Sequence, residues 1–174
     1  MTPQEFEQHL HNLAKQYGEF YDKYAPTIAA KIAVSYFKKS FQTESWERVA
    51  WKEVKRREDS SNFKTISRGK RKGVVVAKNE WGRRKILTGE TGDLGRSIEA
   101  DKSRTGHGQA VVWTSPSAFA KSGKIHAAVH NEGLKAGRGS GFTMPKRQFM
   151  GNSPTLNKLI IEELERKLNN LMNK

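Results

Sequence analysis

The sequence predicts an α+β fold, in which an antiparallel β-meander of about three or four strands packs with two N-terminal helices and one C-terminal helix. Apolar residues recur at spacings of three and four near both ends of the chain. Between these helical patterns lie short β-branched runs, separated by Gly, Ser and Thr clusters. The connections between the runs are too short for helical crossovers, so the strands are expected to be antiparallel. At 174 residues the chain is expected to form a single domain.

Two helices are expected over residues 1–41. In the first, over residues 2–24, Thr2 and Glu5 form a T-x-x-E capping pair and Pro3 takes the first helical position. Its apolar stripe comprises Phe6, Leu10, Leu13, Tyr17, Phe20, Tyr21 and Tyr24. Pro26 then breaks or kinks the chain, and a second helix follows over about 26–41. The two helices form either a hairpin or one bent rod, and the sequence fits both.

The segment 42–72 is expected to be a basic loop, although its first part permits a short helix through Trp46, Val49, Ala50 and Val54. Residues 73–151 are expected to hold the sheet and a long Gly-rich loop. The strand candidates are 74–76, 96–101, 109–115 and 124–130, and the flexible loop is 131–151. The last helix is expected to begin near Ser153, with Pro154 at its first position. Its stripe comprises Leu156, Leu159, Ile160, Leu164, Leu168 and Leu171.

Positive charge is concentrated in the middle of the chain. The net charge is +14, from 32 basic and 18 acidic residues, and residues 51–150 carry +13 of it. Such a field raises the rate of encounter with polyanions, so it indicates contact with nucleic acid or with an acidic protein surface. A basic surface without a dedicated partner fits the charge equally well. The sequence contains no zinc finger, no basic zipper and no RNA-binding aromatic–basic signature.

Composition excludes several classes of protein. With no Cys, the chain has no disulfide scaffold, no Cys-ligated zinc or iron–sulfur cluster and no thiol nucleophile. No apolar run approaches the roughly 18 residues that span a bilayer. The first residues also lack the apolar segment of a secretory signal. The protein is therefore expected to be soluble and not exported by that route.

No constellation of side chains predicts catalysis, a metal site or a cofactor. His126 and His130 are four residues apart, and on the expected strand they would lie about 13 Å apart, too far to hold one ion. The glycines of 89–95 suggest a phosphate cradle, but the segment lacks the G-K-[ST] ending of a P-loop. A carboxylate-metal nuclease is left open by scattered acids, which are Glu90, Asp93, Glu99, Asp101 and Glu132.

Three segments, in this order, carry a resemblance to a known family. They are ILTGETGDLGRSI at 86–98, KIHAAVHNEG at 124–133 with its His-Asn-x-Gly ending, and MPKRQFMG at 144–151 before the last helix. The stretch FKKSF at 37–41 fits as well. Over about residues 25–170 the chain resembles the phage virion morphogenesis proteins, which are similar to the tail-completion proteins of Mu-like and P2-like phages.

The resemblance implies a structural, non-enzymatic role without a cofactor. Such proteins finish the tail or its joint with the head and act as rings, in the host cytoplasm during assembly and then in the virion. Their expected partners are further copies of the chain and other tail or neck proteins, with no membrane. A ring around a passage for DNA would also explain the basic middle of the chain.

The candidate contacts for assembly or for a polyanion are Lys70, Arg71, Lys72, Arg83, Arg84, Lys85, Arg138, Lys146, Arg147 and Phe149. Arg147 and Phe149 either dock the Gly-rich loop or reach a neighbouring subunit. The main alternative function is a sequence-nonspecific nucleic-acid-binding protein. A third alternative, a metal-dependent nuclease, would depend on Glu132 or Asp93.

Overall fold

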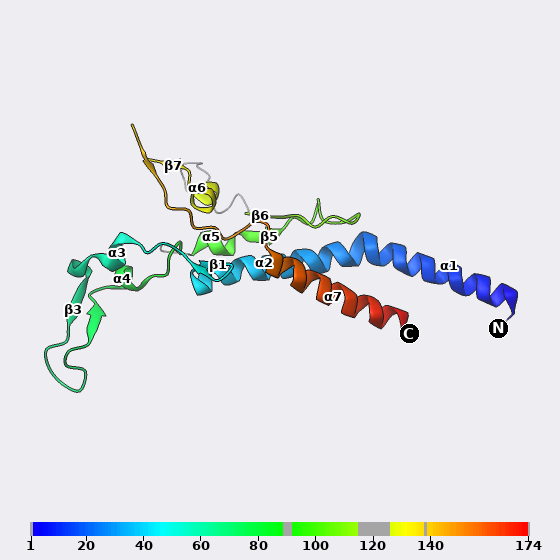
Figure 1. Ribbon diagram of the computed structural model, residues 1–174, viewed down its shortest axis with the longest axis horizontal. Helices are drawn as coiled ribbons and strands as arrows, with labels where there is room; N and C mark the ends of the chain where they lie inside the picture. Colours follow the sequence, from blue (N-terminus) through cyan, green and yellow to red (C-terminus); the bar gives the residue numbers. More distant parts are fainter. Residues whose placement is uncertain (1, 89–91, 115–125, 138, 174) are drawn as a thin grey trace. The chain divides into compact units, whose positions relative to one another are not determined.

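The computed structural model describes residues 2–88, 92–114, 126–137 and 139–173 (Figure 1). Helices and short antiparallel strand pairs alternate along the chain, so the α+β class is confirmed. The chain divides into two compact units. Unit 1 combines residues 1–37, 98–115 and 152–174, and unit 2 combines 38–97 and 116–151. The single-domain organisation stays a prediction.

A continuous helical rod forms the start of the chain. It consists of α1 (Pro3–Glu19), a π-helical turn η1 (Phe20–Tyr24) and α2 (Ala25–Thr43), of which residues up to 37 belong to unit 1. The expected capping box is present: Glu5 N–H donates to Thr2 Oγ1 at 3.2 Å, and Thr2 N–H donates to Glu5 Oε2 at 2.6 Å. Of the two arrangements that the sequence allows, the rod is the one observed.

The π-helical turn lies directly before Pro26, and the missing N–H of that proline explains it. In a regular helix the N–H of residue 26 would bond to the carbonyl of Asp22, but proline has no such donor. The Asp22 carbonyl instead accepts the His107 N–H at 2.7 Å, and Ala25 N–H donates to Phe20 O. Pro26 therefore frees a carbonyl that a strand hairpin of the same unit binds.

That hairpin pairs β5 (Ile98–Ala100) with β6 (Val112–Thr114). Asp101 organises the turn that follows β5. Its Oδ1 accepts the Ser103 hydroxyl at 2.6 Å and the Ser103 N–H at 3.0 Å, and its Oδ2 accepts Arg104 Nε at 2.6 Å. Hydrogen bonds from Ser103 and then Arg104 to the charged form lower the pKa of Asp101 to about 2.

Asp101→Asn is expected to lower the free energy of unfolding at pH 7, and the deficit relative to wild type should shrink as the pH falls from about 4 to about 2. The folded state holds the pKa of this carboxyl below the ordinary value of 3.8, so its charge stabilises the fold above that value. As the pH falls through about 2, the wild-type carboxyl is protonated as well. Urea unfolding of both proteins over this pH range measures the difference, and a deficit independent of pH would contradict the assignment.

The C-terminal helix α7 (Pro154–Met172) begins where the sequence predicts. Ser153 is fully buried and caps it, because its Oγ accepts the Leu156 N–H at 2.9 Å. The same hydroxyl donates to Tyr36 Oη at 3.2 Å, which ties the start of α7 to α2. Near its end, Met172 Sδ accepts the Tyr17 hydroxyl at 3.1 Å. Figure 1 shows α7 running beside the rod.

The predicted meander is wrong, because within the described residues every strand pairs with only one other. The sheets are four separate antiparallel pairs. Besides β5–β6 they are β1 (Ser45–Trp46) with β2 (Val49–Ala50), β3 (Phe63–Thr65) with β4 (Val75–Ala77), and β7 (Lys135–Ala136) with β8 (Phe142–Thr143). Each strand has only two or three residues, and short helices and turns separate the pairs. The β-branched runs therefore form local hairpins.

Several predictions for segments of unit 2 are also wrong. The short helix over 46–54 is instead the β1–β2 hairpin, whose turn places Glu47 and Arg48 at φ of 47° and 66°. The basic loop 42–72 and the Gly-rich loop 131–151 both contain ordered elements. The former holds α3 (Lys55–Glu58), a 3₁₀ turn η2 (Ser60–Asn62) and β3, and the latter holds β7 and β8.

The strand expected at 124–130 is a helix over its described residues, α6 (His126–Glu132). Two adjacent alanines favour a helix, and Gly133, at φ +72°, supplies the left-handed residue that ends it. The expected strands at 74–76, 96–101 and 109–115 become β4, β5 and β6, with α4 (Glu80–Arg83) and α5 (Asp93–Arg96) between β4 and β5. Lys124 and Ser115 lie outside the described residues.

The core of unit 2 is an aromatic cluster. Phe41, Trp51 and Phe149 are all buried, and the Phe41 ring lies 5.6 Å from Trp51 and 5.0 Å from Phe149. Trp51 Nε1 donates to the carbonyl of Gln148 at 2.7 Å. Gly95 lies against the same Phe41 ring, since a Cβ at this position would be 3.3 Å from it. The cluster thus joins parts of the chain that are far apart in sequence.

Candidate functional site

Two of the segments that carry the family resemblance hold each other in unit 2. Asn131 Oδ1, on α6, accepts the N–H groups of Phe149 at 2.9 Å and Met150 at 3.0 Å. The preceding carbonyl, of His130, accepts the Arg147 N–H at 2.8 Å. Gly133 lies so close to Lys146 that a Cβ would be 3.0 Å from the Lys146 Cβ. The His-Asn-x-Gly sequence therefore fixes the 144–151 segment, and with it Phe149 in the aromatic core.

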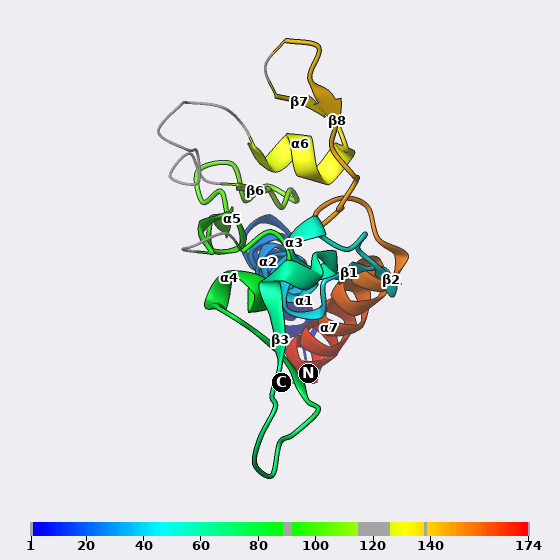
Figure 2. The ribbon, with the colours of Figure 1, turned by 90° about the vertical axis from the view of Figure 1, so that its left-hand side faces the viewer.

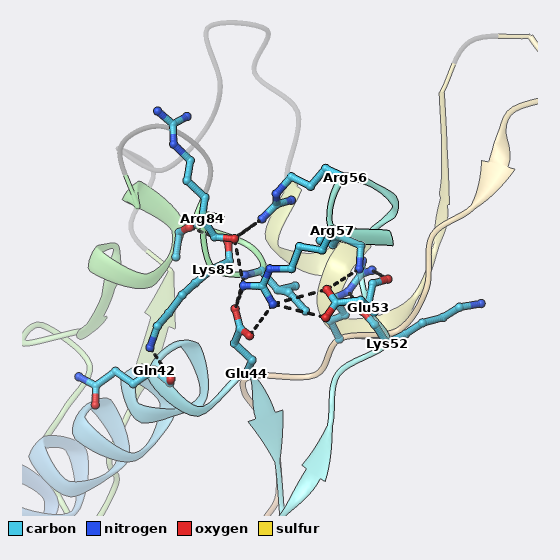
Figure 3. Close-up of polar contacts among 12 residues, drawn as sticks. Gln42, Glu44, Lys52, Glu53, Arg56, Arg57, Arg84 and Lys85 are labelled. Carbon is cyan, nitrogen blue, oxygen red and sulfur yellow. Dashed lines mark hydrogen bonds and ion pairs between the residues drawn. The ribbon is translucent and has the colours of Figure 1, made fainter. Parts of the chain in front are cut away.

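An ion pair stands at the centre of a second set of contacts (Figure 3). Arg57 donates to both carboxylate oxygens of Glu44, at 2.7 and 2.9 Å, and the Ile86 N–H donates to Glu44 Oε1 at 2.6 Å. The side chains of Arg57 and Glu44 are only 20% and 22% exposed. The Arg57 hydrogen bond lowers the pKa of Glu44, and the reciprocal bond raises the pKa of Arg57.

Two further arginines bind backbone carbonyls. Arg56 donates to the carbonyls of Trp81, Arg84 and Lys85 at 3.2, 2.8 and 2.9 Å. Arg147 is buried and donates to the carbonyls of Lys52 at 2.9 Å and Glu53 at 3.2 Å. Burial lowers the pKa of both Arg56 and Arg147, but a guanidinium stays protonated at neutral pH. These cations fasten loops of unit 2 to one another.

The basic hairpin, defined here as residues 63–78, carries a different kind of cation. Its strands are β3 and β4, and the pairing continues past them through Ile66 N–H to Val74 O at 3.0 Å. The segment from 60 to 79 contains six Lys or Arg residues and no Asp or Glu. Lys70, Arg71 and Lys72 lie in its turn and are exposed. Figure 2 shows this turn extending away from α3 and α4 of the same unit.

An open pocket of about 520 Å³ lies between the basic hairpin and α4. Three of its lining residues are arginines: Arg57, Arg71 and Arg83. The rest of the lining is Phe63, Val75, Val76, Ala77 and Gly82. Arg57 is already paired with Glu44, whereas Arg71 and Arg83 are exposed. The pocket thus combines guanidinium donors with an apolar wall, which suits a ligand that is both acidic and apolar.

The structure separates the predicted contact residues into two groups. Exposed side chains belong to Lys70, Arg71, Lys72, Arg83, Lys85 and Lys146, and Arg84 is half-buried. Lys85 Nζ is engaged all the same, because it donates to the carbonyl of Gln42 at 2.6 Å. Arg147 and Phe149 are buried and dock the 144–151 segment within their own unit. Arg138 lies outside the described residues.

Several residues of this region were not anticipated from the sequence. They are Glu44, Trp51, Arg56, Arg57, Trp81 and the side-chain role of Asn131. Arg56 and Arg84 flank the half-exposed Trp81 ring, at 5.1 and 5.9 Å from its centroid. Residues 44–59 hold five acids and five bases, and this mixture of charges was the available signal for an ion pair in the segment.

His126 and His130 share one face of α6, so the expected separation on a strand does not apply. Burial, followed by the charges of Arg147 and His126, lowers the pKa of His130. Across the described ranges, no three His, Asp or Glu side chains lie close enough together to hold a metal ion. Nor does any helix in the described part of the chain have the length and apolar character to cross a membrane.

Comparison with known proteins identifies the family to which the chain belongs. A model of the phage virion morphogenesis family matches residues 50–169. The match includes all three segments that carried the resemblance, the basic hairpin and most of α7. The comparisons with curated proteins and with solved structures each gave no match. The match spans more than half of the chain, and the chain therefore belongs to the phage virion morphogenesis family.

Proposed function

We propose that the protein completes the phage tail or joins it to the head, as one subunit of an oligomeric ring. Membership of the phage virion morphogenesis family carries this proposal. The distribution of cations supports it: Arg56, Arg57 and Arg147 stabilise unit 2, while Lys70, Arg71 and Lys72 stand exposed on a hairpin that needs none of them for its own pairing. Those exposed cations are available to other virion proteins, to further copies of the chain or to DNA.

Deletion of the gene from its phage, followed by complementation from a plasmid, tests the function. Wild-type protein is expected to restore infectious particles. A triple variant with Lys70, Arg71 and Lys72 changed to Gln should fold but restore them at least about tenfold less well, because its contact surface has lost three charges. A matched variant changes the exposed lysines Lys15, Lys31 and Lys39 to Gln and should complement nearly as well as wild type. Normal particle yield without any plasmid would contradict the proposal.

A second candidate function is sequence-nonspecific binding of nucleic acid, and the basic hairpin is the observation that favours it. Six cations without an acid within 20 residues form a continuous site for phosphates. Binding to DNA by the isolated chain would then be strong and would fall steeply as the salt concentration rises. Assembly that depends on protein concentration, without such binding, favours the structural ring instead.

A further inference from the structure

Helix α1 presents an apolar stripe whose N-terminal part is exposed. Phe6, Leu10 and Tyr17 are 53%, 48% and 38% exposed, and no residue of α1 is buried. α7 ends beside Tyr17, so the stripe continues past it toward the N-terminus of α1. The helix is also acidic, with Glu5, Glu7 and Glu19 against Lys15 alone. An apolar stripe flanked by acids is the surface of a helix that binds a basic apolar partner.

The pocket beside the basic hairpin has the complementary character. Within the described residues, Arg71 and Arg83 have no ion-pair partner. The apolar wall beside them is open as well, since Val75 is 63% exposed. A volume of about 520 Å³ accommodates one large aromatic side chain together with its neighbours on a helix.

We infer that this pocket binds helix α1 of a second copy of the chain. Phe6 and Leu10 would cover the wall formed by Phe63 and Val75, and Glu7, which borders the stripe, would pair with Arg71 or Arg83. Phe6 and Leu10 are four apart and share a face, and Glu7, three residues before Leu10, borders that face, so adjacent parts of the helix surface offer both kinds of contact. This contact would join neighbouring subunits of the proposed ring, so its role in the phage rests on the proposed function.

A nucleic acid is a poorer occupant of the same pocket. Phosphates would satisfy Arg71 and Arg83, but the sugar–phosphate backbone offers less apolar surface to Val75 and Phe63 than an apolar helix face does. An acidic amphipathic helix satisfies the guanidinium groups and covers the apolar wall together. The chemistry of the pocket therefore favours the protein partner.

The symmetry of this contact matters because the two surfaces differ. In the proposed contact, α1 of one copy binds the pocket of the next copy. Every copy therefore contributes its helix to one neighbour and its pocket to another. Such a heterologous contact propagates from copy to copy and closes into a ring when the rotation between neighbours allows it. A two-fold contact between identical surfaces would stop at a dimer.

Charge reversal of the full-length chain tests the inference, with sedimentation velocity over a range of concentrations as the measurement. Glu7→Lys and Arg71→Glu should each raise the concentration for half-assembly by about tenfold or more. Both residues are exposed, so the variants should retain the wild-type circular dichroism spectrum. The matched controls Glu19→Lys and Lys135→Glu carry the same changes in net charge, lie outside the proposed contact and should assemble as wild type does.

Combining the two charge reversals shows whether Glu7 of one copy contacts Arg71 of another copy. The double variant Glu7→Lys with Arg71→Glu should assemble again, because the charges are exchanged and remain complementary. An equimolar mixture of the two single variants should also assemble, since each helix then finds a matching pocket on the other protein. A contact within one chain would not be restored by mixing.

Three outcomes would overturn the inference. The first is a wild-type chain that stays monomeric at every concentration and yet complements the deletion phage, which separates this failure from failure of the proposed function. The single variants could assemble as well as their controls. Finally, Arg71→Glu could leave assembly intact and abolish only the retention of a DNA duplex, which would assign the pocket to phosphate.

Discussion

Phe149→Ala is expected to lower the free energy of unfolding by about 3–5 kcal/mol, the range for a fully buried aromatic residue replaced by alanine. Phe149 is 1% exposed and its ring packs 5.0 Å from that of Phe41. The variant would lose more than the packing of the phenylalanine side chain. Phe149 also anchors a segment whose N–H groups bind Asn131, and Trp51 bonds to the neighbouring Gln148 carbonyl. A cavity here would therefore loosen contacts between several parts of unit 2.

Chemical denaturation, followed by tryptophan fluorescence, measures this effect because Trp51 lies in the same cluster. Phe142→Ala is the matched control: this phenylalanine is 57% exposed and lies on β8, so its loss should change stability by about 0.5 kcal/mol or less. Equal destabilisation by the two variants would show that Phe149 is not a core residue and would remove the aromatic cluster from the account.

Glu44→Ala is expected to destabilise unit 2 by about 2–3 kcal/mol, because it removes charge-assisted hydrogen bonds and leaves a partly buried guanidinium without its carboxylate. Glu44 joins Arg57, at 2.7 and 2.9 Å, to the backbone of Ile86, at 2.6 Å (Figure 3). Glu53 provides the control. It lies 3.5 Å from the same Arg57 and is 46% exposed, so Glu53→Ala should cost about 1 kcal/mol at most.

The same ion pair predicts the pH dependence of the Glu44→Ala effect. The pKa of Glu44 lies below its ordinary value of 4.5 in the folded protein, so its charge contributes stability above that pH. The contribution disappears as the pH falls through the lowered pKa. The gap in unfolding free energy between wild type and Glu44→Ala should therefore be widest at neutral pH and narrow in acid; a gap that widens in acid would contradict the assignment.

The long helices were predictable from local chemistry. A capping box begins α1, the pair Ser153-Pro154 begins α7, and each helix repeats its apolar residues every three or four positions. Such signals lie within a few residues of each other, so a single sequence displays them. Even Pro26, which forbids one helical hydrogen bond, marked the place of the π-helical turn, although it did not decide between a hairpin and a rod.

The aromatic core and the ion pair of unit 2 could not be predicted, because their residues contact partners that are distant in sequence. Nothing near Phe149 indicates that it will meet Phe41, and nothing near Arg57 indicates Glu44. The 124–130 segment misled for a related reason: its alternating apolar residues fit a strand, while Ala127, Ala128 and the helix-ending Gly133 decide for a helix. The resemblance of whole segments did identify the family, although it did not predict that residues 126–133 and 144–151 lie together.

The division of the arginines carries the functional argument. A strongly basic composition suggests a polyanion-binding protein, yet Arg56, Arg57 and Arg147 are committed to carbonyls and to Glu44 inside unit 2. Among the exposed cations, those of the basic hairpin stand out, because the segment from 60 to 79 holds six Lys or Arg residues and no acid. This local concentration, and not the net charge of +14 as a whole, is the reason for proposing a contact through the hairpin.

Quantitative mass spectrometry of purified mature particles tests whether this chain is a structural part of the virion. We expect the protein to be present in a fixed, small number of copies per particle, as the proposed ring at one position requires. Its absence from mature particles, together with normal particles from the deletion phage, would contradict the claim.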